Sequence, residues 1–553
     1  MKESPERSLW SREALIVFVV SLLAVVAIQW RSSAFEAEFA QHPDESSHFV
    51  SAMLVYDYLA HGAPESPMAY AERYYIHYPK VGIGHWPPGF HGVLGLWLLA
   101  FGVGRVQVML FMAVTMAAGC CISYMLARFI MDRVASAAAV ALLIALPLCQ
   151  ASYISVMTEA PLALACLAAV WAYVQYLRAP GWRPAVAFGL FAAFGLLVKA
   201  TAIALAFVPL LSIIILRRPQ LLKRLDFWAP AVIVLALAGP WYAVNGDLVP
   251  NAMGGTLDRV FSLRRQESTW GRAEFWAFLA GLPMLASAVV GWTHAALKRP
   301  SGSTPFLAAS SAFLFGAIFL NQTLPESAEP RHIHHAAAFV AVFAAAAFAW
   351  LSDVLPRPAR PVVWVLAAAL FFLDGYRLLH KESYGLVEAA QAIDADPNLD
   401  RSLVLITSQE FGEGAFISEM ALLNPHPRHV VIRGNQLLAR VGWSNYAYSS
   451  VFQETEDVVA TLEAETIQAV VVDQSPLPGP QESLLHHELI QAALALRPGD
   501  WTMDRFPGEE DRGAALARTT VRGRTRTRPI RIYRGFYSFN PMELPASDIA
   551  WQP

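Results

Sequence analysis

Three carboxylates lie at the edges of apolar segments, where a charged group is costly to desolvate. Asp44 and Glu45 are adjacent in the polar stretch HPDESSH (residues 42–48), which follows the first apolar segment. Glu159 opens another apolar segment much later in the chain. Ionisable residues at membrane boundaries are expensive to desolvate and commonly mark functional sites. The three acids therefore indicate an active site at a membrane surface.

Two chemistries suit these carboxylates. An acid can act as general base on an acceptor hydroxyl, or it can share a divalent metal with a substrate phosphate. Asp44 and Glu45 point about 100° apart on a helix, so one can react while the other serves as cap or ligand. A structural role is the alternative. Pro43 and two acids start a helix well, and Thr158 can cap a helix that begins with Glu159.

Two cations also lie at the edges of apolar segments. Arg331 enters a late segment in EPRHIHH (residues 329–335), and Lys199 separates two segments with almost no loop. A guanidinium fork matches phosphate oxygens, so Arg331 suits a lipid-linked phosphate at headgroup depth. Either residue can instead be an interfacial cation whose head reaches water. A phosphate contact is the functional hypothesis for both.

Histidines are concentrated near the same segments, with nine of the fifteen in residues 42–91 or 332–335. His332 and His335 are one helical turn apart, a spacing that allows metal binding. Asp44 and Glu45 are the carboxylates that would complete such a site. No cysteine ligand or HExxH spacing accompanies them, so the sequence predicts no firm metal site.

Composition sets the class of protein. Of the 553 residues, 56% are hydrophobic and 15% are charged, and the mean hydropathy is +0.40. Average soluble domains carry about 25% charged residues, so the chain is expected to be a polytopic membrane protein. The net charge of −3 predicts no nucleic-acid partner. All four cysteines lie in apolar segments, where buried packing is expected and no disulfide framework follows.

Eleven apolar segments are candidate membrane spans. They are residues 14–29, 106–127, 134–150, 157–177, 185–198, 200–216, 228–244, 274–292, 304–320, 334–352 and 361–379. A span needs about 17–25 residues, so 185–198 is short. Residues 89–103, after Trp86-Pro87-Pro88, form a further short apolar run.

Basic loops predict the topology. If residues 89–103 lie along the surface as a juxtamembrane helix, every basic loop falls on the side of the N-terminus. The positive-inside rule then favours eleven crossings, a cytoplasmic N-terminus and an exported C-terminus. This topology places all five candidate residues, Asp44, Glu45, Glu159, Lys199 and Arg331, on the outer face. That coincidence supports an outward-facing site.

Three outer regions are long enough to build structure: residues 31–88, 246–272 and 381–553. The last is polar and contains strand-like runs at 403–407, 429–433 and 469–473, followed by a helix-like stretch at 483–495. We therefore expect a transmembrane catalytic domain over 1–380, with its catalytic loop at 31–88, and an exported α/β domain over 381–553. Alternating arginines at 522, 524, 526 and 528 predict a charged strand face, either solvated or bound to an anionic headgroup or glycan.

The order of these motifs resembles the GT-C fold glycosyltransferases, in particular the bacterial branch similar to protein mannosyltransferases and lipid A aminoarabinose transferases. The motifs are the acidic pair, GHWPPGF (residues 84–90), Thr158-Glu159, GLLVK (195–199), GPWY (239–242) and Arg331. The resemblance covers about residues 10–380. It implies a polyprenyl-phosphate-linked sugar donor, a lipid, glycan or protein acceptor with a hydroxyl group, and catalysis at the outer face of a bacterial inner membrane.

The resemblance also implies roles for single residues. Asp44 matches the family's catalytic acid, Glu45 its partner and Glu159 the second-loop acid, which is commonly Asp in relatives. Lys199 and Arg331 match positions that face the donor phosphate. Some members carry Lys before the Pro of the juxtamembrane helix, where this chain has Trp86 preceded by His85, and His85 is the candidate for a phosphate contact there. No cofactor is certain, although a divalent cation such as Mg²⁺ or Mn²⁺ fits the acids.

These roles make a coherent reaction. Displacement of a phosphate from the donor needs cations on the leaving group and one base on the acceptor, and a single displacement would invert the anomeric centre. A ligase or polymerase acting on whole lipid-linked glycans would share such an outer site. A transporter would instead place ionisable residues near the bilayer midplane.

Overall fold

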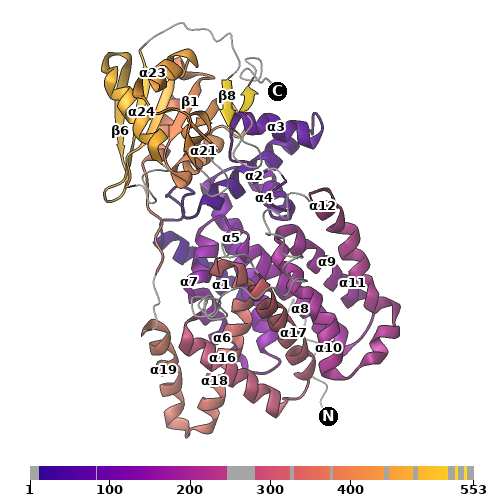
Figure 1. Cartoon of the computed structure of the whole chain (residues 1–553). Helices are drawn as coiled ribbons and strands as arrows, with labels where there is room; N and C mark the ends of the chain where they lie inside the picture. Colours follow the sequence, from indigo (N-terminus) through magenta and orange to yellow (C-terminus); the bar gives the residue numbers. More distant parts are fainter. Residues whose placement is uncertain are drawn as a thin grey trace. The chain divides into compact units, whose positions relative to one another are not determined.

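The computed structural model describes residues 12–82, 84–245, 280–323, 329–373, 378–440, 448–476, 484–520, 530–533 and 541–544. The expected outer loop at 246–272 and the arginine alternation at 522–528 lie outside these residues. The described chain is mostly helical, with a small sheet region near its C-terminus (Figure 1).

The chain divides into two compact units, and each is described by itself. The first, the helical unit, comprises residues 1–32, 84–90 and 109–379. The second, the α/β unit, comprises residues 33–83, 91–108 and 380–553. Residues 33–83, most of the expected catalytic loop, thus group with the C-terminal region. Helices α4 (Gly89–Phe101) and α5 (Arg105–Ala127) each continue from one unit into the other.

Apolar helices build the helical unit. Besides part of α5 they are α1 (Arg12–Arg31), α6 (Arg133–Ala145), α7 (Pro147–Ile154), α8 (Glu159–Arg178), α9 (Trp182–Val198), η1 (Ala200–Ala206), α10 (Phe207–Leu216), η2 (Pro219–Lys223), α11 (Leu225–Leu237), α12 (Gly239–Val244), α16 (Leu282–Lys298), α17 (Thr304–Thr323), η3 (Pro330–Ala336), α18 (Ala337–Val354), η4 (Arg357–Ala359) and α19 (Arg360–Leu373). Each predicted span coincides, over its described residues, with one of these helices or with a consecutive pair.

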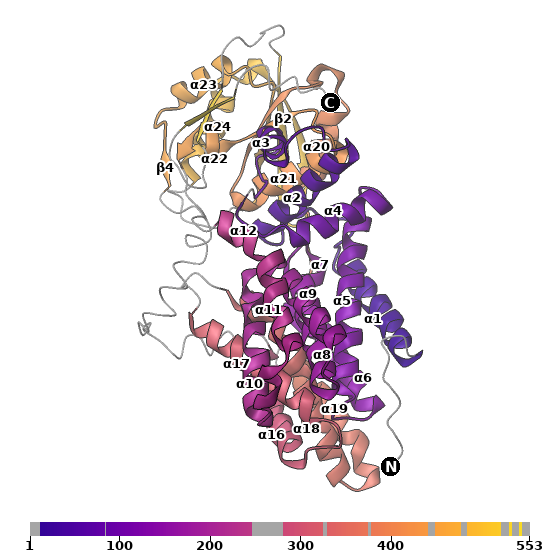
Figure 2. The same cartoon turned by 90° about the vertical axis from the view of Figure 1, so that its right-hand side faces the viewer.

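Small residues allow the helices to pack closely. Helix α8 packs against α9, α9 against α11, and α16 against α18 (Figure 2). A Cβ atom at Gly316 of α17 would lie 2.6 Å from the carbonyl oxygen of Ala204 in η1, so only glycine permits this approach. In a lipid bilayer, helices associate through such close contacts at small residues.

Five described helical segments are long and apolar enough to cross a membrane: α1, α5, α8, residues 304–321 and residues 330–354. Helices α6 and α7 would make a sixth if this pair, bent by 65°, forms one span. Shorter apolar helices cover residues 89–101, 182–198, 200–216 and 225–237. The eleven crossings therefore stay a prediction, because several of the expected spans coincide with helices shorter than a usual span.

The α/β unit contains α2 (Pro43–Ala60), α3 (Pro67–His77), α20 (Leu386–Asp394), η5 (Pro397–Leu399), β1 (Leu403–Thr407), α21 (Glu410–Leu423), β2 (Val430–Arg433), α22 (Gly434–Leu437), β3 (Ala439–Arg440), β4 (Ser449–Ser450), α23 (Thr455–Ala464), β5 (Ala469–Asp473), α24 (Leu485–Leu496), η8 (Pro498–Asp500), β6 (Trp501–Pro507), β7 (Gly513–Thr519), β8 (Ile530–Tyr533) and β9 (Pro541–Leu544). The strand runs predicted at 403–407, 429–433 and 469–473 are β1, β2 and β5, and the predicted helix is α24.

The main sheet has five strands in the order β2-β1-β5-β7-β6, with β2, β1 and β5 parallel and β7 and β6 antiparallel. Successive side chains of a strand point to opposite faces. Leu405 and Val470 on one face form a buried cluster with Val458 of α23 and Ile490 of α24. Helices α20 and α21 also contact the strands, so the sheet is an apolar layer between helices.

Ion pairs tie the first loop to the C-terminal chain inside this unit. Lys381 Nζ lies 2.7 Å from Glu45 Oε1, and both side chains are buried. Arg105, the first residue of α5, donates Nη1 to the backbone carbonyl of Ala37 in the first loop at 2.9 Å and pairs through Nη2 at 2.7 Å with Glu419 of α21. Burial lowers the pKa of Lys381, and the charge of Glu45 opposes that shift. The fold of residues 33–83 thus depends on charges supplied from beyond residue 380.

Each partner of this buried pair should be needed for stability as long as the other is present. Removing one partner of a buried ion pair leaves an uncompensated charge and costs about 3–5 kcal/mol. Lys381→Met should therefore lower the melting temperature of the purified full-length protein strongly. His380→Ala, which removes an exposed contact with Glu509, should change it little. The double variant Glu45→Gln/Lys381→Met should recover part of the loss, and no loss in Lys381→Met would contradict this role.

Candidate functional site

Three sequence-predicted residues come together in the helical unit. Lys199 Nζ lies 2.6 Å from Glu159 Oε1, and Arg331 Nη1 lies 3.9 Å from the same oxygen. The Glu159 side chain is 3% exposed, whereas Lys199 and Arg331 keep 17% and 15%. We call these three residues the cation cluster. Its members are 40 to 172 positions apart in sequence, so only the packing of three separate elements creates it.

Each member sits where a helix begins or ends. Glu159 is the first residue of α8, where a negative charge is favoured by the exposed N–H groups of the helix. Lys199 ends α9 in an extended conformation (φ −158°, ψ 138°), which turns the chain into η1. Arg331 lies in the first turn of η3, and its Nε donates to Glu329 Oε2 at 3.0 Å. The helix ends at these three positions therefore direct the three side chains toward one another.

The end of α9 is also where other family-like motifs meet. Tyr242 of the GPWY motif donates its hydroxyl to the carbonyl of Leu196 at 2.8 Å. A Cβ atom at Gly89 would lie 2.8 Å from the carbonyl oxygen of Leu197, so the Pro-Pro segment can pack here only with glycine. Both contacts brace the turn that presents Lys199.

The charges of the cluster do not balance. One carboxylate faces two cations, and Glu159 Oε2 has no hydrogen-bond partner among the described residues. Glu329 pairs with Arg331 from a half-exposed position, where it is screened by solvent. The cluster can therefore accept an anion such as a phosphate group. Glu159 has the geometry of a residue that positions the two cations.

The acidic pair lies in the α/β unit, at the start of α2. The backbone N–H of Asp44 donates to His42 Nδ1 at 3.1 Å, and Asp44 keeps 15% of its side chain exposed. Glu45 is fully buried, and its two oxygens accept from Lys381 and from the backbone N–H of Gln41. Glu45 therefore has a structural role. This agrees with the hypothesis from the sequence that one acid of the pair reacts while the other serves as its partner or as a cap.

The predicted histidines have varied surroundings. His332 Nδ1 accepts from the backbone N–H of Glu329 at 2.9 Å and so caps η3. His335 is buried beside Phe313, with ring centroids 5.6 Å apart. His85 packs edge-on against Trp86. Neither His332 nor His335 belongs to a cluster of metal-ligand side chains within the described ranges, where one such group occurs elsewhere, around Asp57.

The sequence analysis did not identify several charged residues that support the loop of the acidic pair. Lys381 and Arg105 support the loop that carries the acidic pair, and Glu38 accepts from the backbone N–H of Leu386 at 2.9 Å at the start of α20. Nothing in their local spacing indicates these partners, because each pairing spans tens to hundreds of residues. The placement of Lys381 directly after the last apolar segment was the one available signal.

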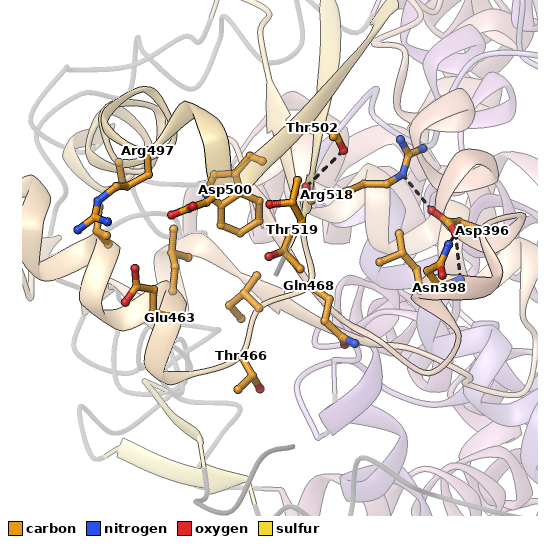
Figure 3. Close-up of a pocket in the computed structure, with 17 residues that line it drawn as sticks. Asp396, Asn398, Glu463, Thr466, Gln468, Arg497, Asp500, Thr502, Arg518 and Thr519 are labelled. Carbon is orange, nitrogen blue, oxygen red and sulfur yellow. Dashed lines mark hydrogen bonds and ion pairs between the residues drawn. The ribbon is translucent and has the colours of Figure 1, made fainter. Parts of the chain in front are cut away.

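A polar cavity of about 810 Å³ opens in the α/β unit among η5, α23, α24, β6 and β7 (Figure 3). Asp396, Asn398 and Arg518 lie together on one side, with Arg518 Nε 3.4 Å from Asp396 Oδ2, and Glu463 and Arg497 lie on the other. Trp501 also lines it.

Comparison with known proteins identifies the fold. Residues 85–243 match the family model of dolichyl-phosphate-mannose-protein mannosyltransferase, a range that includes His85, Glu159 and Lys199. No curated protein matches the chain significantly. Among solved structures, ArnT from Cupriavidus metallidurans bound to undecaprenyl phosphate is similar at 16% identity and TM-score 0.56, covering 91% of this chain and 97% of its own.

The oligosaccharyltransferase of Archaeoglobus fulgidus is also similar, at 13% identity and TM-score 0.53, covering 85% of this chain and 70% of its own. The same archaeal enzyme, AglB, in complex with an inhibitory peptide and a dolichol-phosphate matches at 14% identity and TM-score 0.52, over 84% and 69% of the two chains. This chain has the GT-C glycosyltransferase fold. The expected GT-C fold is thus confirmed, whereas the eleven crossings and the exported C-terminal domain stay predictions. The cation cluster lies in the helical unit of this fold.

Proposed function

We propose that this protein is a membrane glycosyltransferase that moves a sugar from a polyprenyl-phosphate donor to a hydroxyl acceptor. The observation that carries the proposal is the cation cluster, in which Glu159 holds Lys199 and Arg331 close together in a helical unit of the GT-C fold. Similar structures bind undecaprenyl phosphate and dolichol-phosphate, which are phosphates on polyprenyl chains. Those ligands, together with the two cations of the cluster, support a polyprenyl-phosphate donor.

Lys199 and Arg331 would stabilise the departing phosphate. Donors placed in advance where negative charge develops give a large part of the rate enhancement in such reactions. Glu329, the other carboxylate that pairs with Arg331, is 47% exposed and screened by solvent, so the cluster keeps attraction for an anion. Arg331 can form two parallel hydrogen bonds to the phosphate, and Lys199 adds a point charge. Glu159 would hold the two cations in position through its contacts with both.

Asp44 is the proposed general base on the acceptor, with inversion at the anomeric carbon. Its carboxylate is partly exposed, whereas Glu45 is committed to Lys381 and Gln41. A divalent cation, Mg²⁺ or Mn²⁺, bound by Asp44 together with the donor phosphate is an alternative role for this acid. The one-sided basic loops support an outward-facing site in a bacterial inner membrane, with a cytoplasmic N-terminus and a periplasmic C-terminal region.

A lipid-linked glycan ligase or polymerase is the second candidate. The similarity to an archaeal oligosaccharyltransferase favours it, because that enzyme class transfers whole oligosaccharides. A transporter has less support, since the charged residues of the cation cluster lie at helix ends and breaks. The two enzymes differ in donor: a monophosphate-linked sugar for the transferase and a pyrophosphate-linked oligosaccharide for the ligase.

A donor panel distinguishes these functions. The purified protein, with hydroxyl acceptors supplied as cell-envelope lipid or glycan fractions, should release polyprenyl phosphate from one polyprenyl-phosphate sugar. Release of polyprenyl pyrophosphate from an oligosaccharide donor would favour the ligase, and no release from any donor would reject both. Adding a chelator to the productive reaction should leave it unchanged if Asp44 acts directly as base, and stop it if a divalent cation is needed.

Arg331 should be needed for donor use. A charge-assisted contact is worth about 1.5–3 kcal/mol, so Arg331→Ala should weaken donor affinity roughly 10- to 100-fold. Arg331→Lys should recover only part, because the two-pronged contact is lost. Donor binding measured by competition with polyprenyl phosphate checks this. Wild-type affinity in a folded Arg331→Ala protein would rule out the role.

Asp44→Asn should abolish turnover while donor binding survives. The substitution keeps the shape of the side chain but removes its basicity, and a positioned base contributes about 10²–10⁴-fold. Glu45→Gln should mainly lower thermal stability, because Glu45 pairs with Lys381. Glu159→Gln should instead weaken donor binding, because the two cations lose their shared partner. Near-normal transfer by Asp44→Asn, with turnover lost in Glu159→Gln, would indicate that Glu159 is the base in place of Asp44.

A further inference from the structure

A compact group of potential metal ligands lies in the α/β unit, apart from the acids and cations used above. Asp57 and His61 belong to the last turn of α2 and the residue after it, and His426 comes from the loop between α21 and β2. His61 Nδ1 lies 3.0 Å from Asp57 Oδ1, and His426 Nδ1 lies 3.1 Å from Asp57 Oδ2. The three ligand atoms all lie within 4.8 Å of one another.

We propose that Asp57, His61 and His426 form a zinc site that ties α2 to the loop before β2. Imidazole and carboxylate ligands suit Zn²⁺, which prefers tetrahedral coordination. Bonds of about 2.0–2.1 Å at the tetrahedral angle place ligand atoms roughly 3.3 Å apart. The separations of 3.0 and 3.1 Å between the imidazole nitrogens and the carboxylate are close to that spacing. Two imidazoles and a carboxylate leave one coordination position for water.

The orientation of the rings fits the same ion. Both histidines direct Nδ1 toward the carboxylate, and their ring centroids are 4.4 Å apart. His61 Nδ1 also lies 2.9 Å from the backbone carbonyl oxygen of Asp57, a hydrogen bond that the ion would replace. An ion bound at both Nδ1 atoms would fix each proton on Nε2, which is a normal form of a ligating imidazole. His61 and His426 are 33% and 24% exposed, so an ion has access from solvent.

Asp57 is prepared for this role by its surroundings. Its side chain is 1% exposed, and Tyr70 donates its hydroxyl to Asp57 Oδ2 at 2.8 Å. A hydrogen bond to a ligating carboxylate orients it and tunes the ion. A buried carboxylate beside two imidazoles can instead serve as their hydrogen-bond acceptor, without metal. The two alternatives differ in whether the protein binds Zn²⁺.

The ion would have a positional effect. Helix α2 begins with Asp44 and Glu45 and ends at this group, and α2 packs against α21, which leads into the loop of His426. With Lys381 holding its first turn, α2 would be fixed to the C-terminal chain at both ends. The site therefore supports the helix that carries the proposed base, and it takes no part in sugar transfer.

Titration of the metal-stripped full-length protein with Zn²⁺ tests the proposal by calorimetry and thermal unfolding. We expect one equivalent to bind tightly and raise the melting temperature, while Mg²⁺ does neither. Loss of a partner outside the coordination shell typically costs 10–100-fold in metal affinity, so Tyr70→Phe should fall in that range. His426→Ala and His61→Ala, which remove ligands, should weaken binding by about 100-fold or more.

The control is His380→Ala, which removes an exposed histidine that also faces a carboxylate but has no second imidazole. It should bind Zn²⁺ like the wild type. His426→Gln keeps a hydrogen-bond donor, so it should stay folded without metal yet lose the zinc-induced rise in melting temperature. No stoichiometric binding by the wild type, or equal binding by His426→Ala and the wild type, would overturn the proposal. Neither result bears on donor specificity.

Discussion

A single buried carboxylate keeps two cations together at the broken ends of apolar helices. Lys199 and Arg331 would repel each other without Glu159, and neither could be placed at an apolar boundary cheaply. Glu159 can do this because it starts α8, where the helix N-terminus favours its charge, and because α9 stops at Lys199. The helix breaks, the glycine contact at Leu197 and the Tyr242 hydrogen bond all serve this geometry.

A buried ion pair also organises the α/β unit, but there a cation satisfies an acid. There a buried cation from the C-terminal chain, Lys381, satisfies an acid of the first loop, Glu45. A buried pair contributes little net stability, because desolvation offsets the attraction, but it penalises every arrangement that separates the partners. Residues 33–83 consequently fold on the C-terminal chain, although a membrane segment lies between them in sequence. The acidic pair divides accordingly: Glu45 holds the helix, and Asp44 remains at its partly exposed start.

The sequence predicts the local elements well and their partners poorly. Strands β1 and β5 match the predicted runs residue for residue, since buried β-branched residues bounded by polar ones leave a clear pattern. The cation cluster was also predictable, as each member stands out as a charge at an apolar edge. Lys381, Arg105 and His426 were not, because their partners lie hundreds of residues away. Local periodicity contains no information on such pairings.

The division of the acids between two units bears on how a GT-C protein can vary. The family model matches residues 85–243, which hold Glu159 and Lys199, whereas Arg331 and the acids Asp44, Glu45 and Asp57 lie outside that range. The three residues proposed to hold the donor phosphate, Glu159, Lys199 and Arg331, all belong to the helical unit. The proposed base, Asp44, belongs instead to the α/β unit, which also holds the polar cavity. The proposed roles thus divide between the units: the phosphate contacts belong to the helical unit and the proposed base to the α/β unit.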